Sequence, residues 1–124
     1  MFGRGQTTKQ VGDRAEQRAE THLHQRGLKT VTKNFHCKGG EVDLIMRHGD
    51  CLVFVEVRYR KRVDFGAGSD TIDYRKQQKV ITAARSYLQK HKLTDQQACR
   101  FDVVSLSGDL NRPNIDWIEN AFGV

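Results

Sequence analysis

Residues 41–58 read EVDLIMRHGDCLVFVEVR, which is two apolar runs on either side of Gly49 and Asp50. Glycine can take the positive φ that the first central position of a type II′ turn requires, so this stretch predicts a β-hairpin. With Gly49 and Asp50 at the centre of the turn, His48 faces Cys51, and this sets the register of both strands. Both faces are apolar near the middle, which is typical of strands in a sheet covered on both sides.

This register places carboxylates on facing strands, with Asp43 opposite Glu56 and Glu41 opposite Arg58. Carboxylates directly across a sheet have Cβ atoms about 5 Å apart, and like charges so placed are destabilising. A divalent cation turns this repulsion into affinity, because Mg²⁺ binds carboxylate oxygens, water and a substrate phosphate. Such a metal polarises the phosphoryl oxygen and lowers the pKa of a bound water. The pattern therefore indicates phosphodiester cleavage.

Arg58 follows Glu56 by two residues, so its side chain projects from the same face of the strand. A guanidinium there can neutralise charge in the transition state but, with a pKa above about 12, cannot act as a general base. A second interpretation stays open. The carboxylates of the hairpin and Arg58 can instead form a cross-strand ladder of ion pairs, which are ordinary on sheet surfaces.

The segments around the hairpin complete an α/β pattern, because helical and strand periodicities alternate along the chain. The predicted elements are a helix from Val11 that stops at Gly27, a strand at 28–37, a turn at 38–40, the hairpin, a glycine-rich loop at 64–69, a helix capped by Asp70 or Asp73 that ends near His91, a strand at 101–106, a loop at 108–114 and a short strand at 115–118. Residues 1–10 are expected to be a flexible arm, and residues 11–124 a single domain.

This order, α-β-β-β-α-β-β, predicts an α/β core with a mixed central sheet flanked by helices. The first three strands form an antiparallel meander because their turns are short. The crossing through the second helix lets the fourth strand run parallel to its neighbour.

The composition favours a basic intracellular domain. The chain has 124 residues, 21 Lys and Arg against 15 Asp and Glu, a formal charge of +6 and a pI of about 9.5. Such a surface attracts polyanions. No apolar stretch approaches the roughly 20 residues of a membrane span, and no secretory signal is recognisable, so a cytoplasmic protein without membrane association is expected. Three cysteines without C-x-x-C spacing favour neither disulfides nor zinc.

Basic residues gather after the hairpin and on the second predicted helix, where they are expected to contact the phosphate backbone of nucleic acid. A solvated basic face is the alternative. The aromatic residues Tyr74, Tyr87 and Trp117 are expected to pack in the core rather than to stack on bases. The candidate nucleic-acid-binding residues are Arg60, Lys61, Arg62, Lys76 and Lys79.

The hairpin resembles a known signature. GEVDLI at 40–45 followed by FVEVR at 54–58 is similar to the G-E-x-D-L-I … F-V-E-V-K pattern of the YraN-like family. These small bacterial proteins are assigned to the restriction-endonuclease-like PD-(D/E)xK superfamily and are similar to archaeal Holliday-junction resolvases. Further matches are Gly12, Glu16, Ala19, Leu23 and Gly27 in the first helix, Lys76 at the start of the second, RFD at 100–102 and AF at 121–122.

The resemblance implies a metal-dependent endonuclease-like protein that acts on DNA, and a preference for branched or structured DNA rests on it alone. It implies that Asp43 and Glu56 bind Mg²⁺ or Mn²⁺ and that Glu16 orients a metal-bound water. Arg58 stands where the family pattern has lysine. Charge stabilisation survives that change, whereas a step that needs a neutral amine does not.

Two other functions stay open. The chain can be a nucleic-acid-binding module that kept the nuclease fold and basic surface but lost turnover. Arg58, in place of the family lysine, is the residue that indicates this loss. Alternatively, the basic surface meets an acidic protein. A homodimer is compatible with each of these functions.

Overall fold

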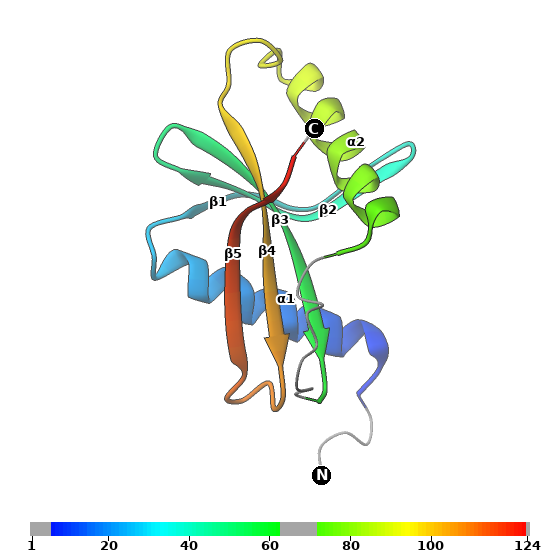
Figure 1. The fold of residues 1–124 in the computed structure, drawn as a ribbon, viewed down its shortest axis with the longest axis vertical. Coiled ribbons are helices and arrows are strands. Elements are labelled where there is room, and N and C mark those ends of the chain that lie inside the picture. Colours follow the sequence, from blue (N-terminus) through cyan, green and yellow to red (C-terminus); the bar gives the residue numbers. More distant parts are fainter. Residues whose placement is uncertain (1–5, 63–71, 124) are drawn as a thin grey trace.

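The computed structural model describes residues 6–62 and 72–123, which form a twisted sheet with two helices (Figure 1). The order of elements and the mixed α/β sheet confirm the predicted fold class. In chain order the elements are α1 (Thr8–His24), β1 (Lys29–Cys37), β2 (Gly40–His48), β3 (Cys51–Arg60), α2 (Tyr74–Lys90), β4 (Cys99–Ser107) and β5 (Asn114–Phe122).

Helix α1 begins three residues before the predicted start at Val11. The Thr7 hydroxyl accepts from the Gln10 N–H at 3.1 Å, and the Gln10 side chain accepts from the Thr7 N–H at 2.8 Å. This reciprocal capping box satisfies donors that a helix start otherwise leaves free. Residues 8–10, expected in the flexible arm, are therefore helical. Residues 1–5 of that arm lie outside the described residues.

The other helix and strand boundaries follow the predictions closely. Asp73 caps α2, since its Oδ1 accepts from the Lys76 N–H at 2.8 Å. The predicted loop at 64–69 and the alternative cap Asp70 lie outside the described residues. Strand β5 extends to Phe122, four residues beyond the predicted end at Ile118. Of the added residues, Glu119 and Asn120 carry little strand propensity, and the pairing of Phe122 with Phe101 of β4 extends the strand past them.

The sheet has the order β1-β2-β3-β4-β5, with β3 and β4 parallel and every other neighbour pair antiparallel. The predicted hairpin register is confirmed at its turn, where His48 pairs with Cys51 and Gly49 has a φ of 63°. That positive φ is the conformation that required glycine.

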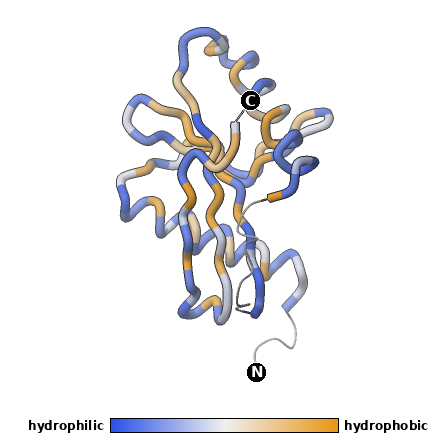
Figure 2. Tube along the Cα trace, in the orientation of Figure 1, coloured by the Kyte–Doolittle hydropathy of each residue, from blue (hydrophilic) through white to orange (hydrophobic). Residues whose placement is uncertain are grey.

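Two apolar cores lie on opposite faces of the sheet, one under each helix. Phe54 packs with Tyr87 of α2, whereas the next residue, Val55, packs with Leu23 of α1. Figure 2 shows the hydrophobic colouring concentrated along the central strands. Among the helices in the described ranges, neither combines the length and apolarity that crossing a bilayer demands.

Gly40 lets α2 approach the start of β2. A Cβ on Gly40 would lie 2.7 Å from both the Ala83 nitrogen and the Lys79 carbonyl oxygen. Gly40→Ala is therefore expected to lower the free energy of unfolding by about 1–3 kcal/mol, because the helix backbone cannot yield without losing its packing.

Urea denaturation measures this effect, with Gly12→Ala as the matched control. Gly12 lies in α1 with nothing within 4 Å of an added Cβ, so alanine should stabilise the helix by about 0.5–1 kcal/mol. Equal effects of the two substitutions would contradict the close approach at Gly40.

Candidate functional site

The acidic residues meet where β2 and β3 separate. The pairing of these strands runs from the turn to Leu44 and Val55. Beyond that pair, the Asp43 carboxylate accepts a hydrogen bond from the Val57 N–H at 2.9 Å. The predicted direct pairing of Asp43 with Glu56 is therefore corrected, because Asp43 reaches past Glu56 to the backbone of the next residue. The predicted pairing of Glu41 with Arg58 likewise lies beyond the paired part of the hairpin.

Strand β2 changes face at Asp43. Leu44 packs in the core under α1, whereas Val42, two residues away, packs in the core under α2. In a regular strand these two side chains would share a face. The neighbouring strand also departs from regular geometry at this level, since Asn34 has a φ of 50° between the pairs that Lys33 and Phe35 form with β2. Asparagine tolerates this conformation better than β-branched residues do.

Glu16 reaches the same place from α1. Burial, the Asp43 charge and a hydrogen bond with Asp43 raise the pKa of Glu16 to about 7, while a hydrogen bond with Asn34 opposes the shift. Asn34 is a site neighbour that sequence reasoning missed, because its strand carried no polar pattern that distinguished it. The structure thus brings together all three carboxyl groups named from the sequence: Glu16, Asp43 and Glu56.

Glu56 is 3% exposed, so its charge is expensive to maintain. One carboxylate oxygen, Oε2, lies 3.0 Å from the Lys76 ammonium nitrogen. The other, Oε1, is buried and has no hydrogen-bond donor within the described parts of the chain. Burial and the Asp43 charge raise the pKa of Glu56 to about 8, although Lys76 acts in the opposite direction.

Asp43 is the anion at the centre of the cluster. Burial raises its pKa, while the Val57 N–H, Lys76 and hydrogen bonds from Glu56 and Glu16 limit the rise. Those two glutamates donate to Asp43 when they are protonated, which adds to the rise in their own pKa values that burial and the Asp43 charge cause. The cluster therefore holds protons that a cation could replace.

Lys76 lies inside the acidic cluster, although the sequence placed it among the residues expected to contact a phosphate backbone. Its Nζ is 3.0 Å from Oε2 of Glu56 and 3.0 Å from Oε2 of Glu41. Burial opposes its charge, but both carboxylates outweigh this and raise the pKa of Lys76. The close approach of α2 at Gly40 positions this lysine, since the two residues lie at the same contact between α2 and β2.

The other basic candidates occupy two regions. Arg58 continues β3 and pairs with Ser105 of the parallel strand β4. Arg60 ends β3, and the exposed residues Lys61 and Arg62 follow it. Lys79 is exposed on α2, on the other side of the sheet from α1.

A ready-made metal site is not present in the described ranges, where no three His, Cys, Asp or Glu side chains are arranged to hold an ion. Cation binding at the acidic cluster therefore requires the carboxylates to rotate and Lys76 to release or share Glu56.

The prediction that the aromatic residues pack in the core is confirmed for some of them and wrong for one. Tyr87 is buried at 8% exposure, as expected of a core residue, whereas Tyr74 at the start of α2 is 73% exposed and the core interpretation is wrong for it. Its position in the first turn of α2, before the apolar stripe begins, explains the exposure. Trp117 is partly buried and packs against the core under α1.

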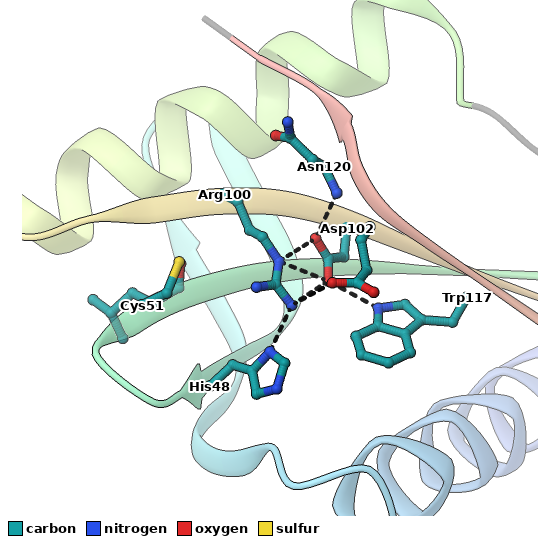
Figure 3. A network of polar contacts seen from close by, with 8 residues as sticks. His48, Cys51, Arg100, Asp102, Trp117 and Asn120 are labelled. Atoms are coloured by element: carbon teal, nitrogen blue, oxygen red, sulfur yellow. Dashed lines mark hydrogen bonds and ion pairs between the residues drawn. The ribbon is translucent and has the colours of Figure 1, made fainter.

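A second polar cluster, around Asp102, is structural (Figure 3). Asp102 is fully buried and accepts from Arg100, from the Trp117 indole N–H at 2.8 Å and from the Asn120 N–H at 2.9 Å. Nη2 of Arg100, which also donates to Asp102, lies 3.0 Å from Nδ1 of His48. Because both Asp102 oxygens have donors, this carboxylate differs from Glu56 and offers no free ligand position.

The raised pKa of Glu56 predicts how stability depends on pH without metal. Its protonated form is favoured by folding, so its contribution is full below the unfolded pKa near 4.5 and is lost as pH rises through about 8. Raising the pH from 5 to 9 in EDTA should therefore cost up to about 4 kcal/mol of unfolding free energy at this group.

Glu56→Gln should flatten this dependence, because the amide stays neutral and can donate to Asp43. Urea denaturation at several pH values gives the measurement. Asp95→Asn, at an exposed position, should retain the wild-type slope. A Glu56→Gln protein with the wild-type pH slope would show that Glu56 is ionised throughout.

Comparisons with known proteins give one consistent result. The sequence model of the uncharacterised protein family UPF0102 matches residues 15–106. A UPF0102 protein of Aeromonas hydrophila is 50% identical over 112 residues, which cover 90% of this chain and 83% of that protein. A UPF0102 protein of Legionella pneumophila strain Philadelphia 1 is 47% identical over 115 residues, which cover 93% and 96% respectively.

Proposed function

The chain belongs to the uncharacterised protein family UPF0102, and we propose that it is a metal-dependent endonuclease-like protein that hydrolyses phosphodiester bonds in DNA. Membership confirms the family resemblance noted in the sequence. The nuclease activity is our proposal, and its main support is the cluster of Glu16, Asp43 and Glu56, in which Glu56 is buried and the other two are half-buried. Placing three carboxyl groups together where water is partly excluded raises their pKa values and costs stability, so the needs of folding do not explain their placement.

The donor set fits Mg²⁺ or Mn²⁺. Asp43 and Glu56 would bind the cation directly and Glu16 through water, since hard cations prefer carboxylate oxygens. The buried Oε1 of Glu56 supports this fit, because within the described residues it lacks the donor that a purely structural carboxylate would have. A bound cation would polarise the phosphate and make a water molecule more acidic.

The residues around the acidic cluster would have separate roles in the reaction. The Val57 N–H orients Asp43, and Glu16 would accept a proton from the water that it would hold. Arg58 would neutralise charge on the phosphate. Lys76 would keep the cluster partly neutral before the cation binds. The basic residues Arg60, Lys61, Arg62 and Lys79 would hold the DNA backbone.

The test is a cleavage assay on single-stranded, duplex and four-way-junction DNA with Mg²⁺ or Mn²⁺. We expect cleavage that EDTA abolishes, and the resemblance to junction resolvases favours the branched substrate. Absence of cleavage on every substrate with either metal would contradict the proposal.

A binding module without turnover is the second candidate, and the ion pair between Lys76 and Glu56 favours it because a lysine holds part of the position that a cation needs. Arg58→Lys tests this alternative. If the parent binds DNA without cutting it and Arg58→Lys cuts with metal, Arg58 explains the lost turnover. If both proteins cut equally well, the binding-only function is wrong. If neither binds nucleic acid at low salt, the basic surface would instead suit an acidic protein.

A further inference from the structure

A groove lies where α1 begins, β3 ends and β4 connects to β5. Its volume is about 640 Å³, within the usual range for ligand sites. It is lined on one side by Val11 and Arg14 of α1, and on the other by Tyr59, Lys61 and Leu110. In Figure 1 the arrowhead of β3, the connection after β4 and the first turns of α1 all lie towards the lower end of the molecule.

The walls of the groove are held in place by hydrogen bonds. The Tyr59 hydroxyl donates to the Gly108 carbonyl at 2.6 Å. The Arg18 guanidinium donates to the Leu110 carbonyl at 2.9 Å, and Arg14 donates to the Asn111 side chain at 2.9 Å. The aromatic ring is thus fixed before any ligand arrives, which lowers the entropy cost of binding.

The lining combines an aromatic ring with positive charge. Arg14 and the exposed Lys61 face the groove, and its acidic residue, Asp109, already accepts a hydrogen bond from the Asn111 N–H. Aromatic rings beside cations bind single-stranded nucleic acid, because bases stack on the ring and phosphates pair with the cations. The charge of +6 on the whole chain fits the same class of ligand.

The groove adjoins the acidic cluster. Val57, whose N–H holds Asp43, and Tyr59 both pack towards the core under α1, so they share a face of β3. Two residues of strand span about 7 Å. A DNA strand held at the carboxylates would therefore continue directly into the groove.

We propose that this groove binds an unpaired nucleotide next to the scissile phosphate, with its base against Tyr59 and its phosphate at Arg14 and Lys61. The inference rests on the proposed function for the position of the phosphate. It adds a substrate class, namely DNA with a single-stranded segment at the cut.

Fluorescence anisotropy in EDTA tests this binding without any cleavage. The probes are a labelled duplex with a short single-stranded overhang and the corresponding blunt duplex. Tyr59→Leu should weaken binding of the overhang probe about 10-fold and leave the blunt probe unchanged, because base stacking contributes about 1–3 kcal/mol. Tyr59→Phe keeps the ring but loses its hydrogen bond to the Gly108 carbonyl, so it should bind the overhang probe more weakly than the parent does and more tightly than Tyr59→Leu does. Thermal melting identifies any variant that fails to fold.

Lys61→Ala gives an independent readout that needs no change in the core. It should reduce the salt dependence of overhang binding by about one phosphate contact, whereas Lys90→Ala, exposed at the end of α2, should not. Equal loss on both probes in Tyr59→Leu, or the same loss in Tyr59→Phe, would overturn the proposal. The proposal would also be overturned if Tyr59→Leu and Lys61→Ala both bound the overhang probe as tightly as the parent does. Failure of the parent protein to bind the overhang probe would overturn it as well.

The outcomes separate this inference from the nuclease proposal. If overhang binding depends on Tyr59 but the protein never cuts DNA, the groove is a nucleotide-binding site and the nuclease proposal is wrong. If the protein cuts DNA with metal but every variant binds both probes equally, the nuclease proposal is supported and the proposed role of the groove is wrong.

Discussion

Asp43→Asn is expected to lower the rate of metal-dependent DNA cleavage by more than about 1,000-fold, while it raises the thermal stability of the metal-free protein. Asparagine nearly keeps the shape of Asp43 and can still accept from the Val57 N–H. Above about pH 8, where Glu16 and Glu56 are both ionised, the substitution removes the Asp43 charge that repels them and so stabilises the metal-free cluster. The same change removes a ligand for the cation.

Melting curves with and without Mn²⁺ separate this site from a structural network of ion pairs. A cation at 100 times its dissociation constant stabilises the parent by about 2.7 kcal/mol, and Asp43→Asn should blunt this response. Asp50→Asn, in the turn of the same hairpin, should keep parental cleavage and metal response. If Asp43→Asn instead lowers the melting temperature and Mn²⁺ does not change it, Asp43 has only a structural role.

Asp102→Ala is expected to cost about 3–5 kcal/mol of unfolding free energy, because it leaves Arg100 without its buried partner. The same substitution also removes the acceptors of the Trp117 indole and the Asn120 N–H, which join β4 to β5. The pairing of β4 with β5 is irregular at Asp102, so its side chain replaces contacts that a regular ladder would make.

Guanidinium denaturation measures this loss, with Asp116→Ala as control. Asp116 lies exposed on β5, where substitution should change the free energy by less than about 0.5 kcal/mol. A loss below about 1 kcal/mol in Asp102→Ala would mean that water replaces the carboxylate and that the cluster is not essential to the fold.

The sequence by itself determined the hairpin and its carboxylates Asp43 and Glu56, whereas Glu16 was named only through the family resemblance. Gly49 and the apolar runs beside it are local signals, and a turn sets the register of its own strands, so His48 and Cys51 pair as predicted. The order of elements followed in the same way from periodicity and caps such as Asp73. These features depend on neighbours in the chain, and a sequence displays them directly.

Only the tertiary structure decided which groups surround the carboxylates. Lys76 enters the cluster because α2 packs closely on β2 at Gly40, and Asn34 contributes because β1 bends beside Asp43. Tyr59 and Arg14 share a groove although 45 positions separate them in the chain. Such contacts depend on how distant elements pack, and a periodic pattern shows which face of an element is buried but not which residue it meets.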